Sequence, residues 1–145
     1  MREKTGGWMS DFRKLVLWQK SHNFTLAVYE LTANFPKTEL FGLVSQLRRA
    51  STSIGCNIVE GLGRRGDREL LRFLRIAQGS SVEVEYQLLL AHDLGFVADV
   101  DYKRLNVAIG EIGRMLTGLS AKVHKRTENT ADVVASRTSY LVPRD

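Results

Sequence analysis

The sequence predicts an all-α fold, a bundle of four helices, and three observations support this prediction. Apolar residues recur every three or four positions through most of residues 12–123, which is the spacing of one face of an α-helix. A proline and several glycines interrupt the pattern and separate the helices. No sustained alternation of apolar and polar residues and no Asn-Gly turn is present, so strands are not expected. A chain of 145 residues has room for one domain with a hydrophobic core.

The first helix is predicted to run from Phe12 to Phe35, because Pro36 lacks the backbone N–H group that a further helical turn requires. Its apolar row consists of Phe24, Val28, Leu31 and Phe35. Residues 1–11 are polar and contain a Gly-Gly pair, so we expect a flexible N-terminal segment there. The bundle domain is then expected to span residues 12–123.

The second helix is predicted over about residues 40–62. Its core-facing stripe consists of Leu40, Leu43, Val44, Leu47, Ser51, Ile54, Ile58 and Leu62. Gly61, Gly63 and Gly66 are expected to end this helix, since each glycine lowers helix stability by about 1 kcal/mol relative to alanine. Asp67 is expected to cap the third helix by accepting hydrogen bonds from its first backbone N–H groups.

The third helix is predicted from Arg68 to Leu94 and carries apolar residues on two sides. Its core row consists of Leu70, Phe73, Leu74, Ala77, Ser81, Val84, Leu88 and Ala91. A second apolar group lies opposite or beside that row and consists of Val82, Tyr86, Leu89 and Leu90. One bundle cannot bury both sides, so we expect the second group to form an interface with other copies of the chain. The alternative is that a long neighbouring helix or loop covers it.

The fourth helix is predicted to begin at a cap formed by Asp99 or Asp101 and to end near Lys122. Its apolar residues keep spacings of three and four over three heptads, a pattern typical of helices that pack nearly parallel or antiparallel. They are Tyr102, Leu105, Ile109, Ile112, Leu116, Leu119 and Val123. Residues 124–145 lose this periodicity and are expected to form a mobile C-terminal tail.

Positive charge is concentrated in the second and third predicted helices. Residues 41–79 contain seven arginines and three acidic residues, and seven minus three gives +4 of the chain's net charge of +5. The arginines are Arg48, Arg49, Arg64, Arg65, Arg68, Arg72 and Arg75. A guanidinium group can donate two hydrogen bonds to one phosphate, so this set predicts a surface that binds nucleic acid. The alternative is an ordinary solvated helix face with local ion pairs.

No arrangement of residues for catalysis or for a cofactor is visible. Gly61–Gly66 has the spacing of a dinucleotide-binding loop, but such a loop follows a strand, whereas this one follows a predicted helix. The three histidines share no metal-ligand spacing and Cys56 is the only cysteine, so neither a metal site nor a disulfide is expected. We therefore expect a non-enzymatic protein without a cofactor. No membrane span or secretory signal is visible, so we expect it in the cytoplasm.

Short segments in order along the chain resemble a known protein family. They are Phe12–Lys20, Tyr29–Thr32, Phe35–Pro36, Gly42–Leu43, Gln46–Ala50, Ser53–Ile54, Asn57–Ile58, Glu60–Gly61, Gly63–Arg64, Phe73–Leu74, Ile76–Ala77, Gly79–Ser80 and Met115–Leu119. Together they resemble the four-helix bundle proteins encoded in intervening sequences of bacterial large-subunit (23S) rRNA genes. The resemblance covers about residues 12–122, with Val59 where the family is expected to have alanine and with no counterpart for the tail.

The resemblance implies an antiparallel, up-down four-helix bundle that assembles into a ring, commonly a pentamer, with a basic surface. The chain is also similar to the accessory protein of diversity-generating retroelements, a bundle of the same kind that binds a reverse transcriptase and nucleic acid. Our first hypothesis is a homo-oligomer that binds nucleic acid, RNA in preference to DNA, through the seven arginines. The second is a scaffold for a partner protein, such as a reverse transcriptase or a ribosome-associated factor, that uses its apolar or basic face.

Overall fold

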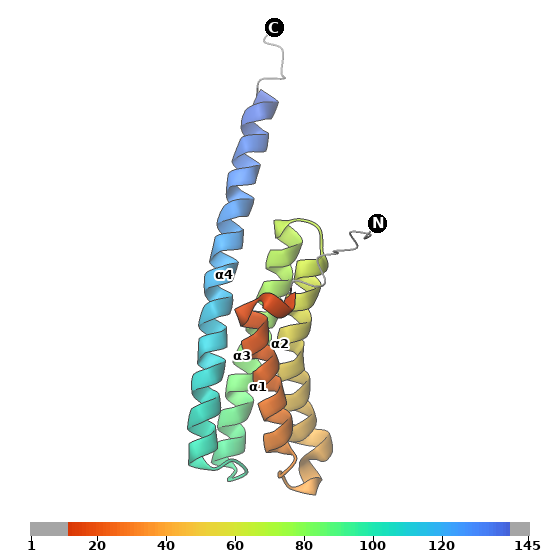
Figure 1. The fold of residues 1–145 in the computed structure, drawn as a ribbon, viewed down its shortest axis with the longest axis vertical. Helices are drawn as coiled ribbons and strands as arrows, with labels where there is room; N and C mark the ends of the chain where they lie inside the picture. Colours follow the sequence, from red (N-terminus) through yellow and green to blue (C-terminus); the bar gives the residue numbers. More distant parts are fainter. Residues whose placement is uncertain (1–11, 140–145) are drawn as a thin grey trace, which may run out of the picture.

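The computed structural model describes residues 12–139, which form an antiparallel, up-down bundle of four α-helices (Figure 1). The helices are α1 (Val16–Thr32), α2 (Ser45–Gly63), α3 (Asp67–Asp93) and α4 (Asp99–Ser139). Consecutive helices run in opposite directions, and α4 packs against α1 as well as against α3. Residues 12–139 contain no strand, so the predicted all-α bundle is confirmed. The predicted flexible segment 1–11 and the end of the predicted tail, residues 140–145, lie outside the described residues.

One hydrophobic core lies between the four helices, and each helix contributes a row of buried side chains to it. The largest fully buried side chains are Val28, Leu47, Ile54, Ile58, Leu74, Val84, Leu88, Leu105, Ile109, Ile112, Leu116 and Val123. Burial of one such side chain stabilises the fold by about 1.5–3 kcal/mol relative to exposure in water. All of them belong to the apolar rows predicted from the sequence, so the predicted core faces are confirmed.

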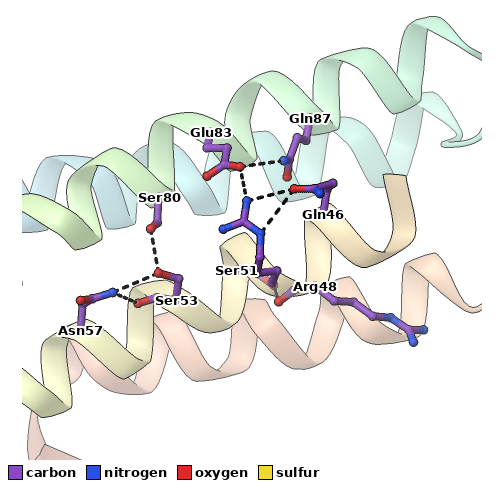
Figure 2. Close-up of polar contacts among 9 residues, drawn as sticks. Gln46, Arg48, Ser51, Ser53, Asn57, Ser80, Glu83 and Gln87 are labelled. Carbon is purple, nitrogen blue, oxygen red and sulfur yellow. Dashed lines mark hydrogen bonds and ion pairs between the residues drawn. The ribbon is translucent and has the colours of Figure 1, made fainter. Parts of the chain in front are cut away.

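Small polar side chains connect α2 and α3 along the middle of their interface (Figure 2). The hydroxyl oxygens of Ser53 and Ser80 lie 2.9 Å apart, and the Asn57 amide donates to the carbonyl and hydroxyl oxygens of Ser53 at 2.7 and 3.0 Å. About one turn away, Glu83 of α3 forms an ion pair with Arg49 of α2 and also accepts a hydrogen bond from Gln87 of its own helix at 3.2 Å. Such directional contacts fix the register of two helices, which apolar packing alone specifies less strictly.

The connection between α1 and α2 differs from the prediction, because α2 begins at Ser45 rather than near Leu40. Short turns of 3₁₀ or π-helix flank α1 and precede α2. They are η2 (Phe12–Lys14), η3 (Lys37–Glu39) and η4 (Leu40–Val44). Gly42 has φ −106° and ψ −114°, which breaks the helical path inside η4. As a result Leu40 and Phe41 are 51% and 93% exposed, and Leu40 does not join the core stripe as predicted.

The ends of α2 and α3 also differ from the prediction. Gly61 does not end α2, because the helix continues through it to Gly63. Gly61 is buried, and a side chain there would collide with Phe73 of α3, so its function is to let the two helices approach each other. Asp67 is not the cap of α3: Gly66 occupies the N-cap position, and Asp67 is the first helical residue.

Helix α4 is 41 residues long and continues to Ser139, whereas the prediction ended it near Lys122 and placed a mobile tail after it. Its last part, residues 124–139, projects beyond the end of the bundle where α2 meets α3 (Figure 1). Loss of apolar periodicity removes packing partners but leaves the backbone hydrogen bonds intact, and residues 119–139 contain no glycine or proline. We call residues 124–139 the α4 extension. None of the helices within residues 12–139 combines the length and the apolar character needed to cross a membrane.

His92 links the end of α3 to the start of α4. Its Nε2 atom lies 2.5 Å from Oδ1 of Asp99, and its ring stacks on Tyr102 with the ring centroids 4.3 Å apart. The hydrogen bond from His92, together with its electrostatic attraction, lowers the pKa of the Asp99 carboxyl from the ordinary value. Between the helices, Gly95 turns the chain with φ 81°, a left-handed conformation that favours glycine.

Candidate nucleic-acid interface

The α2–α3 corner, which we define as residues 63–68, holds three of the seven arginines proposed from the sequence. It lies at the end of the bundle from which the α4 extension projects (Figure 1). Gly66 has φ 86°, so the turn depends on glycine at this position. The turn places Arg64 and Arg65 before α3 and Arg68 within its first turn.

The Phe73 side chain, which is only 5% exposed, lies against two of the arginines. The central guanidinium carbons of Arg64 and Arg72 lie 5.4 and 4.4 Å from the centroid of its ring. Each arginine also forms an ion pair within its own helical segment, Arg64 with Glu60 at 3.0 Å and Arg72 with Glu69 at 3.1 Å. Ion pairs this exposed contribute at most about 1 kcal/mol. Their main effect, with the ring contacts, is to restrict the two guanidinium groups to the surface near the corner.

Arg65, Arg68 and Arg75 are exposed, and none of them forms an ion pair with an acidic side chain of residues 12–139. Within residues 12–139 no carboxylate therefore competes for these three guanidinium groups. Arg68 and Arg75 are seven residues apart on α3, which is about two helical turns and places both on one side of the helix. These three arginines are the part of the predicted set that is most readily available to an anionic ligand.

Arg48 and Arg49 contact neighbouring helices instead, so the seven arginines do not form one continuous site. Arg48 donates from Nε to Oγ1 of Thr32 at 2.9 Å, and its guanidinium carbon lies 4.5 Å from the centroid of the Tyr29 ring. Arg49 forms an ion pair with Glu83 of α3. These contacts connect α2 to α1 through Arg48 and to α3 through Arg49.

Arg126 of α4 is a basic residue of this region that the sequence analysis missed. Its Nε and Nη2 atoms lie 3.2 Å from Oδ2 and Oδ1 of Asp67, so the base of the α4 extension is tied to the start of α3. Lys122 and Lys125 are exposed in the same part of α4. The basic residues Lys122, Lys125 and Arg126 are visible in the sequence. They were not connected with the corner because the residues after 123 were predicted to form a tail.

A groove of about 870 Å³ lies between the corner and α4. Its lining includes Arg64, Arg65 and Arg126 against one acidic residue, Asp67, and three minus one leaves a charge of +2. Leu62 and Leu70 supply apolar surface. A groove with this charge attracts anionic groups such as phosphates.

The residues predicted to form an interface between copies are not all exposed. Val82, Tyr86 and Leu89 are 62%, 63% and 42% exposed, and their spacing continues the side of α3 that carries Arg75. Leu90 is half-buried and packs against the core, because it lies one residue further around the helix. We call Val82, Tyr86 and Leu89 the outer ridge of α3.

No metal-binding group is formed in the described part of the chain: no three His, Cys, Asp or Glu side chains of residues 12–139 lie close enough together to hold an ion. The thiol of Cys56 is exposed on α2. His92 is in contact with Asp99 and Tyr102, as described above.

The bundle and its corner define a class of protein, a small and basic four-helix bundle that carries arginines at one end. The chain belongs to the 23S rRNA-intervening sequence protein family, whose model matches residues 13–118. It is similar to the crystal structure of a protein with unknown function from the S23 ribosomal protein family of Bacteroides thetaiotaomicron VPI-5482. The two share 27% sequence identity and a TM-score of 0.66, over 72% of this chain and 98% of that chain. Among curated proteins, none matches the chain.

Proposed function

We propose that this protein is a non-enzymatic homo-oligomer that binds nucleic acid, structured RNA in preference to DNA, at the α2–α3 corner. The observation that carries the proposal is the exposure of Arg65, Arg68 and Arg75 without an acidic partner in residues 12–139. Neighbouring guanidinium groups repel one another, and a phosphate placed between them relieves this repulsion while it releases counterions. The family description names 23S rRNA, which favours RNA as the ligand, and the proposed location is the bacterial cytoplasm.

The proposed phosphate contacts lie on two helices that meet at one end of the bundle. They are Arg64, Arg65, Arg68, Arg72 and Arg75 of the corner and α3, and Lys122 and Lys125 of α4. Contacts to phosphates carry no base sequence information, so we expect the ligand to be recognised by its shape. Arg48 and Arg49 are left out of the proposed contacts because their guanidinium groups are in contact with α1 and α3.

The test is a variant in which Arg65, Arg68 and Arg75 are all replaced by glutamine. Nuclease-treated protein is titrated against a labelled RNA hairpin and a DNA duplex at about 50 and about 200 mM salt. The variant should bind the hairpin more weakly, and the slope of log affinity against log salt should fall by about 2–3, because three phosphate contacts are removed.

The matched control removes the same charge at the opposite end of the bundle. Lys37, Lys103 and Arg104 are exposed there, and glutamine at all three should leave RNA binding nearly unchanged. An equal loss of affinity in the two triple variants would show that net charge, and not the corner, determines binding. A first variant with the affinity of the unaltered protein would reject the corner as the site.

We also propose that copies of the chain associate through the outer ridge of α3, in a ring. A groove of about 430 Å³ lies beside the ridge between α3 and α4, and Gly110 and Gly113 leave room in it for side chains of a neighbour. Tyr86→Glu should lower the mass measured by light scattering, because a charge would be buried in the interface. Leu26→Glu, at a position 55% exposed on α1, is the matched control and should keep the mass of the unaltered protein.

The second candidate function is a scaffold that presents the outer ridge to a different protein, and the exposure of Val82 and Tyr86 also favours this function. The two functions differ in what remains bound after nuclease treatment. A single protein that co-purifies in fixed proportion and is lost from the Tyr86→Glu variant would support the scaffold. A ring that binds RNA and no such protein would support the first function.

A further inference from the structure

A second groove lies between the α4 extension and the α2–α3 corner, and the proposed RNA contacts leave most of its lining unused. It has a volume of about 660 Å³. One wall is formed by Arg65–Arg68 and the other by one face of the extension. The extension residues are Thr127, Thr130, Ala131, Val134 and Ala135. Figure 1 shows the last turns of the extension with no other helix of residues 12–139 beside them.

The wall formed by the extension is apolar, although two of its residues are threonines. The Thr127 hydroxyl donates to the His124 carbonyl oxygen at 2.6 Å, and the Thr130 hydroxyl donates to the Arg126 carbonyl oxygen at 2.9 Å. Each threonine hydroxyl has one hydrogen to donate, and the helix backbone accepts it. The wall therefore offers methyl groups and no free hydroxyl donor for a phosphate. Its small side chains allow another helix to pack at the short end of the usual 8–10 Å range, about 8 Å between axes.

The opposite wall is positively charged. Arg65 and Arg68 form no ion pair with residues 12–139, whereas Asp67 is already paired with Arg126. The residues that line this wall, two arginines against one aspartate, have a net charge of +1, and the pairing of that aspartate with Arg126 leaves both arginines without an acidic partner in residues 12–139. The complementary ligand is an amphipathic helix with small apolar residues along one stripe and Asp or Glu along the flank next to the arginines.

We propose that this groove binds an acidic amphipathic helix of a partner protein. Residues 127–135 span about 12 Å, which is enough for anchor residues at positions i, i+3 or i+4, and i+7 of a bound helix, since these cover about 10.5 Å. A second α4 extension is a poorer match, because residues 124–139 contain three basic and two acidic residues and so bring a charge of +1 towards the arginines. The family match ends at residue 118, so the groove depends on a part of the chain outside the matched region.

The probe is a labelled helical peptide of about 18 residues with an alanine and leucine stripe flanked by glutamates, and its matched control carries lysine in place of every glutamate. Binding to the full-length protein is measured by fluorescence anisotropy. The glutamate peptide should bind at least about tenfold more tightly than the lysine peptide. Ala131→Trp fills the groove and should weaken binding about tenfold or more, whereas Asn129→Trp, on the other side of the helix, should not.

RNA binding separates this proposal from the proposed function. Ala131→Trp removes no charge, so its affinity for the RNA hairpin should equal that of the unaltered protein whether or not the corner is the RNA site. Three results would overturn the docking proposal. They are no binding of the glutamate peptide, equal affinity of the protein for both peptides, and equal affinity of Ala131→Trp and the unaltered protein for the glutamate peptide. A peptide with the sequence of residues 124–139 that binds more tightly than the glutamate peptide would also overturn it and assign the groove to a second copy.

Discussion

Gly61 of α2 and Phe73 of α3 approach so closely that a Cβ atom on Gly61 would lie 2.9 Å from the Cβ atom of Phe73. The same atom would lie 3.4 Å from the backbone carbonyl oxygen of Leu70. Neither neighbour is the end of a flexible side chain, so α3 itself would have to move. Because Phe73 also supports Arg64 and Arg72, the position of these arginines depends on the glycine.

Gly61→Ala should lower the free energy of unfolding by about 1–3 kcal/mol, because overpacking outweighs the gain of up to about 1 kcal/mol in helix propensity. Gly79→Ala is the control, since a Cβ atom there meets nothing within 4 Å and the position lies inside α3. It should raise the free energy of unfolding by about 0.5–1 kcal/mol. Urea denaturation measures both, and a Gly61→Ala protein as stable as the unaltered one would contradict the close approach.

Arg48→Gln and Arg65→Gln should have opposite consequences, although both remove one arginine. Arg48→Gln removes the hydrogen bond to Thr32 and the contact with the Tyr29 ring, so it should lower the free energy of unfolding by about 1–2 kcal/mol. It should change RNA affinity little. Arg65→Gln should leave stability within about 0.5 kcal/mol and weaken RNA binding. Urea denaturation measures the stability of both variants, and the RNA titration measures their affinity. A loss of RNA affinity in Arg48→Gln alone would show that Arg48, and not Arg65, contacts the RNA.

Asp67→Asn should loosen the α4 extension without unfolding the bundle. The Asp67–Arg126 ion pair links the side chains of the extension and α3, and both partners are partly exposed. The global free energy of unfolding should therefore change by less than about 1 kcal/mol. Amide hydrogens of residues 127–139 should exchange faster, while those in the core helices should not. Asp132→Asn, an exposed change within the extension, should leave the exchange rates as they are.

Asp99 should make the stability of the bundle depend on pH in the acid range. Its carboxyl has a pKa lowered from 3.8 by His92, so ionised Asp99 stabilises the folded state above about pH 4. This contribution is lost as the pH falls below 3.8 and through the lower folded pKa. Asp99→Asn should therefore be less stable than the unaltered protein near neutral pH, and the two stabilities should become similar in acid. The effect is small because Asp99 is exposed. Urea denaturation at neutral and at acid pH measures it. A difference in stability between Asp99→Asn and the unaltered protein that is the same at both pH values would contradict the prediction.

The helices and the core were predictable from the sequence, because each helix buries one stripe and that stripe repeats with the helical period. The misassigned residues are those whose function depends on a distant neighbour. The sequence pattern predicts that Gly61 ends a helix, but glycine is needed at this position because Phe73 of the next helix lies so close. Leu40 fits the core period, yet Gly42 turns the chain before the helix begins. The helix beyond Lys122 was missed because its outward residues have no core to face.

The candidate site was predictable only as a set of charges. Arg48 and Arg65 look alike in the sequence, since each is half of an Arg-Arg pair in the same positively charged segment. They differ in their spatial neighbours: Thr32 and Tyr29 hold Arg48, whereas Arg65 lies in the turn opened by Gly66. Arg126 joins the corner through Asp67, a pair separated by 59 positions in the chain. Such pairings are set by the topology of the bundle and leave no local pattern.

The unequal helix lengths, 41 residues in α4 against 27 in α3, make the two ends of each molecule different. In any cyclic assembly whose axis runs along the bundles, rotation carries every projecting helix to the same side. The assembly would then have two different faces, with the projecting helices and the arginines on one face and the loops around Phe41 on the other. A ligand that approaches along the axis would meet different chemistry from each direction. Directionality would thus be built into an assembly of identical chains by a single overlong helix.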